Sequence, residues 1–450
     1  MKTIDMTEGK IATKLTKFAI PLIAGNILQQ MYVFFDTLFV GRYIGTNGLA
    51  ALGTVEWIVF IIISGAQGFT QGFSIDIAQS AGKKDSKTLE EAIEGSINVC
   101  VLLSIIITAV GLIFGKSLLR SLNTPDEIID LSWSYLRILI LGIAITTFYN
   151  MFSGILRSYG NSVTPLNALI LSSIVNILLD FLFIYHFKLG VVGAAVATLL
   201  AQLSSLIYCT KYVVKIFGDD KLHFSFNVNP RKMYELIKLG APLCFQNIVI
   251  GIGGVAVQAV INTYGAIFIA GYTAANKLYG LLEIGAWGLN GAVGTFVGQN
   301  KGANNYRRVN KGFRVSVVMA IVMGAFMSGI MLGLGEPILR LFLEEEGTVN
   351  MSTITIGKEF LNFLAVFFPL LYILYVLYAV VQGMGNTFMS MISSFAQLFM
   401  RIACAYLLTS KIGYYGFFVG EVMAWVGSNL MLYIAYRIKM KKWRLECYAE

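Results

Sequence analysis

Four oxygen-bearing side chains stand inside long apolar runs of the sequence, at spacings that favour a shared site. They are Asp36, Asn176, Asp180 and Thr198. A charge inside a bilayer costs about 2.5–3.5 kcal/mol on insertion scales, so a carboxylate there indicates a specific structural or functional role. At a rise of 1.5 Å per residue, Asp36, Asp180 and Thr198 lie roughly 8–12 Å from the outer ends of their helices. Asn176 shares the face of Asp180, one turn deeper. The spacing predicts one cation site built by three helices.

Two nearby carboxylates with no obvious basic partner can hold either a proton or a small metal cation. Like charge and desolvation favour the protonated form of a carboxyl group, whereas hard oxygen ligands suit Na⁺. We expect H⁺ as the coupling ion, with Na⁺ at the same four residues as the alternative. A purely structural role, in which the aspartates only hydrogen-bond neighbours near helix ends, also stays open. The five cysteines and two histidines show no metal-ligand spacing, so no other metal and no cofactor is expected.

The elements that position these residues are long apolar helices. Of the 450 residues, 56% are hydrophobic and 13% are charged, about half the charged fraction of soluble domains. That composition excludes a soluble globular protein, and the apolar runs lack the alternation of an outer-membrane barrel. We predict an all-α polytopic membrane protein with twelve transmembrane helices. The predicted spans are 14–40, 48–78, 92–115, 131–157, 163–186, 190–214, 234–262, 270–298, 311–335, 353–383, 388–410 and 414–438.

The distribution of lysine and arginine predicts the orientation of these spans. Twenty-four of these residues fall in segments on one side and seven on the other, and three lie within spans. Because cytoplasmic loops are enriched in basic residues, both termini are expected in the cytoplasm. The net charge of +9 is therefore explained by the basic residues of the cytoplasmic segments, and no nucleic-acid partner is expected.

The sequence repeats itself around a polar stretch in its middle. FAIPLIAGN (18–26) matches KLGAPLCFQN (238–247), and LRSYGN (156–161) matches VQGMGN (381–386). We predict two pseudo-symmetric six-helix lobes, 1–214 and 234–450, joined by a cytoplasmic linker, 215–233. A parallel repeat of this kind favours alternating access around a site at the interface of the lobes.

The second lobe does not duplicate the predicted cation site. The repeat aligns Asn176 with Arg401 and Thr198 with Glu421, and it puts alanine at both aspartate positions. Arg401 and Glu421 both lie roughly 20 Å from the cytoplasmic side, so they can pair. We expect a buried structural ion pair, with a role in coupling or substrate binding as the alternative.

Polar and aromatic residues elsewhere in the spans are candidates for a substrate cavity, where aromatic faces could bind flat cations. The candidates are Glu56, Gln67, Asn150, Glu283, Tyr372 and Tyr375. Each also has a structural alternative, such as a hydrogen bond between helices or, for Glu283, an ion pair with Lys277.

Four short stretches together resemble one transporter family. They are DTLFVGRYIG (36–45), GILRSYGN (154–161) followed by Pro165, NILLD (176–180) and QGMGN (382–386). In combination they resemble the multidrug and toxic compound extrusion (MATE) family, and its bacterial DinF-like branch in particular. The resemblance implies twelve helices in two lobes and export of amphipathic, often cationic drugs in exchange for H⁺ or Na⁺.

The resemblance also implies a place and a site. The expected location is the bacterial cytoplasmic membrane, and the residues matching Asp36, Asn176, Asp180 and Thr198 form the cation site of the first lobe in that family. Some relatives carry a glutamate in the seventh helix where this chain has Ile250. Coupling through a carboxylate in the second lobe is therefore not expected.

We accordingly predict a secondary antiporter that works as a monomer on small amphipathic substrates within the lipid bilayer. The alternative is a flippase for lipid-linked precursors, which usually needs a strongly basic cavity; here only Arg137, Lys277 and Arg401 fall within spans. An enzyme is not expected, because the sequence shows no nucleophile or metal cluster, and no Walker A motif is present for ATP coupling.

Overall fold

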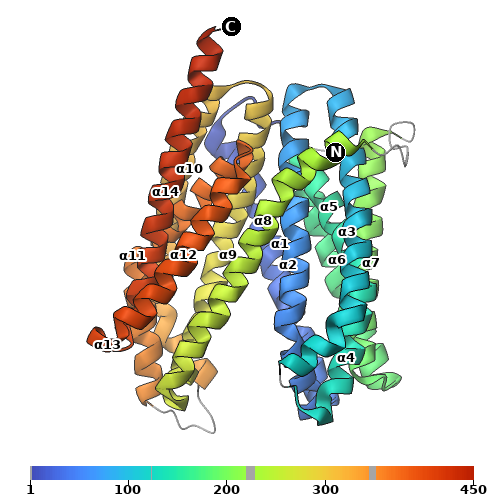
Figure 1. Ribbon diagram of the computed structural model, residues 1–450, viewed down its shortest axis with the longest axis vertical. Coiled ribbons are helices and arrows are strands. Elements are labelled where there is room, and N and C mark those ends of the chain that lie inside the picture. The colour runs from blue at the N-terminus through green and yellow to red at the C-terminus, as the bar shows by residue number, and fades with distance from the viewer. Residues whose placement is uncertain (1–2, 123, 219–228, 344–350, 450) are drawn as a thin grey trace. The chain divides into compact units, whose positions relative to one another are not determined.

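All elements in the part of the chain that the structure describes are helices (Figure 1). The structure is a computed structural model, and it describes residues 3–122, 124–218, 229–343 and 351–449. The first-half elements are α1 (Ile11–Tyr43), α2 (Thr46–Lys83), α3 (Ser86–Ser121), α4 (Asp126–Leu141), α5 (Ile143–Ser158), α6 (Val163–Asp180), the π-helical turn η1 (Phe181–His186) and α7 (Gly190–Phe217). The second-half elements are α8 (Pro230–Ile261), η2 (Asn262–Tyr264), α9 (Ala266–Gly302), α10 (Tyr306–Leu343), α11 (Met351–Gly383), α12 (Thr387–Leu407), α13 (Thr409–Ile412) and α14 (Tyr415–Ala449).

The helices match the twelve predicted spans. Ten helices of the described part are long and apolar enough to cross a membrane, and α4 with α5 forms an eleventh span that is bent by 46°. The twelfth is α9, which is less apolar because it carries Lys277, Glu283 and several glycines. The predicted all-α polytopic membrane protein is confirmed. The predicted span 131–157 is broken at Gly142, which separates α4 from α5.

By their contacts, the helices form two compact units. Unit 1 is Met1–Met6 with Ile20–Ile248, and unit 2 is Thr7–Ala19 with Val249–Glu450. Residues 230–248 of α8 thus pack within unit 1. The predicted division at the linker 215–233 stays a prediction, and residues 219–228 of that linker lie outside the described residues.

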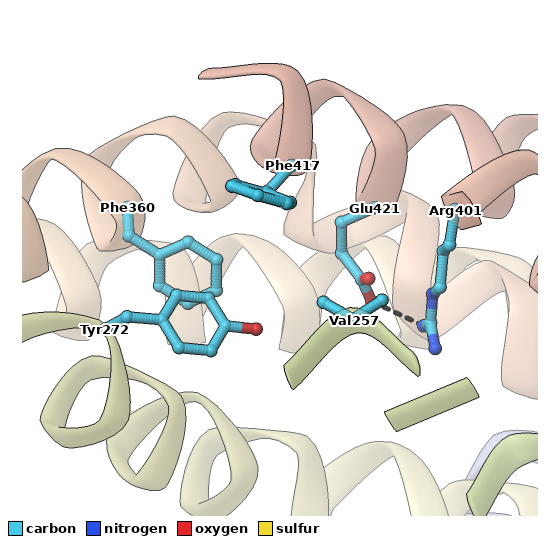
Figure 2. Close-up of a pocket in the computed structure, with 6 residues that line it drawn as sticks. All are labelled: Val257, Tyr272, Phe360, Arg401, Phe417 and Glu421. Carbon is cyan, nitrogen blue, oxygen red and sulfur yellow. Dashed lines mark hydrogen bonds and ion pairs between the residues drawn. The ribbon is translucent and has the colours of Figure 1, made fainter. Parts of the chain in front are cut away.

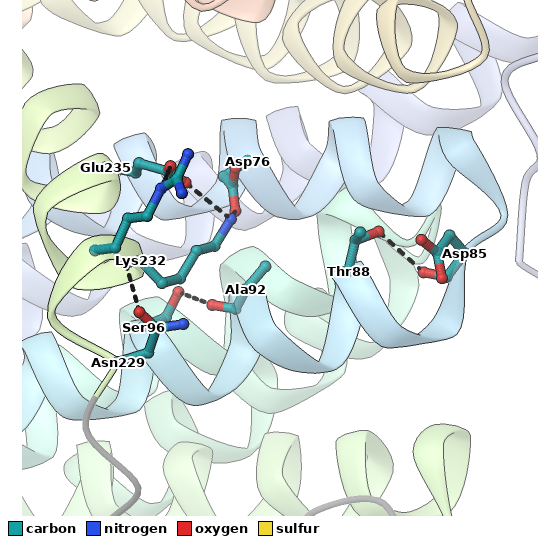
Figure 3. A network of polar contacts seen from close by, with 9 residues as sticks. Asp76, Asp85, Thr88, Ala92, Ser96, Asn229, Lys232 and Glu235 are labelled. Atoms are coloured by element: carbon teal, nitrogen blue, oxygen red, sulfur yellow. Dashed lines mark hydrogen bonds and ion pairs between the residues drawn. The ribbon is translucent and has the colours of Figure 1, made fainter.

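An ion pair fixes the start of α8 within unit 1 (Figure 3). Lys232 Nζ lies 2.7 Å from Asp76 Oδ2 near the end of α2, and the Lys232 backbone N–H donates to Asn229 Oδ1 at 3.2 Å. Both charged side chains are largely buried, so each neutralises the other where water is scarce.

Close backbone contact holds α2 against α8 in unit 1. A Cβ placed on Gly72 would lie 2.5 Å from the Gly240 Cα, so the two backbones touch there. The Asn247 amide donates to the Ser64 carbonyl at 2.8 Å in the same contact. Small residues that let helices approach closely are a usual means of helix association in membranes.

We expect Gly72→Ala to destabilise the protein by about 1–3 kcal/mol, the usual cost of forcing extra atoms into a packed interface. Thermal unfolding of the purified chain in detergent measures the loss. Gly53→Ala is the matched control on α2, because a Cβ at Gly53 meets nothing within 4 Å. Equal melting temperatures for the two variants would contradict the proposed contact.

Candidate functional site

The structure brings the four residues of the predicted cation site together in unit 1. Asp36 lies on α1, Asn176 and Asp180 on the last turns of α6, and Thr198 on α7. All four are buried, and Asn176 and Asp180 expose 0% of their surface. Asp180 lies beside Asn176 and within electrostatic reach of Asp36. Three helices therefore contribute side chains to one buried cluster.

Two tyrosines that the sequence reasoning missed join this cluster. Tyr32 lies one turn before Asp36 on α1, and its hydroxyl is next to the Thr198 side chain and in the field of both aspartates. Tyr135, on α4, is also buried and within electrostatic reach of Asp36. The i, i+4 spacing to Asp36 is the signal that could have identified Tyr32.

The cluster is unusual because most of its polar side-chain atoms have no hydrogen-bond partner among the described residues. Buried polar side-chain atoms that make no hydrogen bond with any described residue occur in Tyr32, Asp36, Asn176, Asp180 and Thr198. More than about nine in ten buried polar groups in proteins have a partner, and an unpaired one costs about 1–3 kcal/mol. Five such side chains in one place form an oxygen-rich cluster, which suits a proton or a small hard cation.

An apolar layer lies one turn beyond the cluster on each of its three helices. Val40 follows Asp36, Ile184 follows Asp180, and Ala194 precedes Thr198 on the antiparallel α7. The three belong to one buried apolar core. In the intervening turn, η1 begins immediately after Asp180, and π-helical turns are frequent at functional sites. This apolar layer lies between the oxygen atoms of the cluster and the ends of α1 and η1, beside the start of α7.

The second repeat carries an internal ion pair at the aligned positions (Figure 2). Arg401 Nη2, on α12, lies 2.5 Å from Glu421 Oε1 on α14. Tyr272 and Phe360 stand on one side of the pair in a cavity of only about 10 Å³, about the space of a single water molecule. The predicted pairing is confirmed, whereas its structural role stays a prediction. The guanidinium supplies a fixed positive charge within this lobe.

Glu283 on α9 makes contact with aromatic residues. Its Oε1 accepts a hydrogen bond from the Tyr375 hydroxyl of α11 at 2.6 Å. Trp287, one turn later on α9, is 56% exposed and packs with Tyr375 at a ring separation of 6.4 Å. The alternative pairing with Lys277 does not occur among the described residues. A carboxylate beside exposed aromatic surface is an arrangement that binds organic cations.

The remaining cavity candidates differ in what they can offer a ligand. Tyr372 is fully buried and donates its hydroxyl to the Leu282 carbonyl at 2.7 Å, so its polar group is already used. The Asn150 amide donates to the Thr146 carbonyl of its own helix. Glu56 is exposed and Gln67 is half-buried. Substrate contact by Glu56, Gln67 or Asn150 stays a prediction.

The chain is similar to known proteins in both of its halves. A family model described as MatE matches residues 21–182 and 242–407. The probable multidrug resistance protein YpnP of Bacillus subtilis (strain 168) is 30% identical, over 97% of each chain. The probable multidrug resistance protein NorM of Thermotoga maritima is 25% identical, over 93% of this chain and 89% of its own.

The fold also matches a solved structure over almost its full length. That structure is the outward-facing conformation of a multidrug resistance MATE family transporter of the MOP superfamily. It is 24% identical, with a TM-score of 0.90, and the match covers 98% of this chain and 99% of that one.

Proposed function

Because this chain belongs to the MatE family of multidrug and toxic compound extrusion transporters, we propose that it is a cation-coupled antiporter working by alternating access. As a family member it is a multi-pass membrane transporter and not an enzyme. Its exported substrates are amphipathic, often cationic compounds. The names of its curated relatives favour multidrug export over a flippase for lipid-linked precursors.

The cluster around Asp36 and Asp180 supports cation coupling most directly. Two buried carboxylates share it, and no basic side chain among the described residues pairs with either. Uncompensated buried charge costs several kcal/mol per ion, so the site is more stable with a proton or a cation bound. Coupling requires that the ion bind with different affinities in the two access states. The site meets this requirement when the cation stabilises it in one state and water hydrates it in the other. We assign H⁺ to this role ahead of Na⁺.

Glu283, Tyr375 and Trp287 support binding of a cationic substrate in unit 2. The carboxylate supplies the counter-charge, and the exposed Trp287 ring supplies an apolar face. Cation–π contacts with such a ring contribute about 0.5–2 kcal/mol. The substrate and the coupling ion would then use separate ligands.

Transport in proteoliposomes under separately imposed gradients tests this function. With purified full-length chain, we expect an imposed ΔpH to drive uptake of a fluorescent amphipathic cation, and a Na⁺ gradient at constant pH to have little effect. The reverse result would move the assignment to Na⁺. Equal uptake in the absence of either gradient would contradict antiport.

The proposed topology places both termini in the cytoplasm. The charge count of 24 against seven basic residues supports it. We expect a cysteine introduced at Lys221, which follows α7 and precedes α8 in the sequence, to react with a membrane-impermeant maleimide only after cells are opened. A cysteine introduced at Lys188, between η1 and α7, is the control and should react in intact cells. Labelling of position 221 from outside would overturn the topology.

A further inference from the structure

An apolar groove on unit 2 shares no lining residue with the sites described above. It has a volume of about 540 Å³ and is formed by α10, α11 and α14. Its walls include Val317, Leu370, Ile373 and Leu430. The volume falls in the range of small-molecule sites, roughly 300–1,000 Å³. The groove is therefore large enough for an elongated apolar ligand.

One end of the groove carries positive charge that no carboxylate in the described part of the chain neutralises. Arg314 lines this end and forms no ion pair with a described residue. Arg437 Nη1 donates to the Tyr433 hydroxyl at 2.9 Å, and Tyr433 also lines the groove. Both arginines act electrostatically on the Tyr436 hydroxyl, so both lie near one tyrosine. Two arginines thus lie near this end, the mouth of the groove.

The charged mouth is at the basic end of the helices. Arg314 is on the first turns of α10, close to Lys311, whereas Leu370 and Leu430 lie farther along their helices from that end. At the far end the Asn429 amide donates to the Leu370 carbonyl at 3.0 Å, so the exposed lining there remains apolar. An occupant must therefore be anionic at the mouth and apolar along its length, which excludes the cationic substrates proposed above.

We propose that this groove binds an anionic phospholipid, with an acyl chain along α10 and α11 and the phosphate between Arg314 and Arg437. Basic pockets between transmembrane helices bind anionic headgroups in this way. Arginine forms paired hydrogen bonds with phosphate oxygens, and its apolar stem packs along the helix while the guanidinium reaches the interface. The ligand comes from the leaflet at the basic end of the helices.

Lipid binding to the purified full-length chain tests the headgroup contact. After delipidation in detergent, we expect phosphatidylglycerol to bind more tightly than phosphatidylcholine when each is titrated and followed by native mass spectrometry. Arg314→Ala and Arg437→Ala should each weaken phosphatidylglycerol about fivefold, since a basic residue at a membrane surface contributes about 1 kcal/mol. Arg307→Ala, on the same helix but outside the groove, is the control and should change little. Equal affinities for the two lipids, or equal losses in all three variants, would overturn the proposal.

Filling the groove tests the acyl-chain contact separately. Ile373 is only half-buried, so Ile373→Trp should block the groove and reduce phosphatidylglycerol binding at least tenfold. Val322→Trp is the control, because Val322 is 63% exposed and does not line the groove. Retained binding in a folded Ile373→Trp variant would contradict an acyl chain in the groove. Displacement of the lipid by tetraphenylphosphonium would instead assign the groove to cationic substrates.

Discussion

Asp36→Asn and Asp180→Asn are each expected to abolish gradient-driven export while the protein still accumulates in the membrane at near-normal levels. Asparagine keeps the shape and the hydrogen-bonding capacity of aspartate but cannot release a proton or carry a negative charge. The unpaired oxygen atoms of the cluster would then lose their differential affinity for the cation, and the transporter would lose its bias between access states. A loss of at least 100-fold in ΔpH-driven uptake, equal to about 2.7 kcal/mol of coupling, is the expected magnitude.

Folding should survive these substitutions because neither aspartate holds another residue in place. Asp36 Oδ1 and both Asp180 carboxylate oxygens make no hydrogen bond within the described structure. The second lobe cannot compensate, since alanine stands at the aligned positions 256 and 405. Asp130→Asn is the control, because among the described residues that exposed carboxylate pairs only with Lys116, and transport should be unchanged. Full gradient-driven uptake in either Asp36→Asn or Asp180→Asn would remove that residue from the cation site.

Substrate binding should separate from coupling in the same variants. The proposed substrate carboxylate, Glu283, lies in unit 2 and bonds to Tyr375, whereas both aspartates lie in unit 1. Equilibrium binding of a fluorescent cation to the purified aspartate variants should therefore stay within a fewfold of the unmodified chain. Loss of binding in parallel with transport would indicate that the ion and the substrate share ligands.

Arg401→Ala and Glu421→Ala should each destabilise the protein severely. The two side chains form an ion pair at 2.5 Å and are each only about one-fifth exposed, so removing one leaves an unpaired charge in a membrane helix bundle. Breaking a buried pair typically costs about 3–5 kcal/mol, and we expect much-reduced expression and a lower melting temperature in detergent.

The double variant Arg401→Leu with Glu421→Leu should be better tolerated than either single change, because it leaves no buried charge. Replacing a buried pair by apolar residues is often neutral or stabilising. Lys116→Ala is the control, since its exposed pair with Asp130 contributes about 0–1 kcal/mol. Normal expression of both single variants with loss of transport would instead make Arg401 and Glu421 part of the transport mechanism.

The sequence by itself determined the features that depend on local order and on burial in lipid. Long apolar runs must become helices, because a bilayer cannot hydrogen-bond an open backbone, so the twelve spans could be predicted. The internal repeat aligned Arg401 and Glu421 with Asn176 and Thr198, and equal depth allowed the ion pair that the structure contains. Spacing and depth likewise placed Asp36 and Asp180 within reach of each other.

Tertiary structure decided which side chains fill the spaces between helices. Tyr32 and Tyr135 join the cation cluster only because α1 and α4 turn those faces inward, and rotation about a helix axis is set by packing against neighbours. The bend between α4 and α5 and the close approach of Gly72 to Gly240 depend on the same packing. The sequence made Tyr372 a candidate for ligand contact, yet packing buries it, and its hydroxyl donates to the Leu282 carbonyl. The hydropathy of a membrane helix shows which residues lie within the bilayer. It says little about which face of the helix packs against other helices, because lipid and the helix interface are similarly apolar.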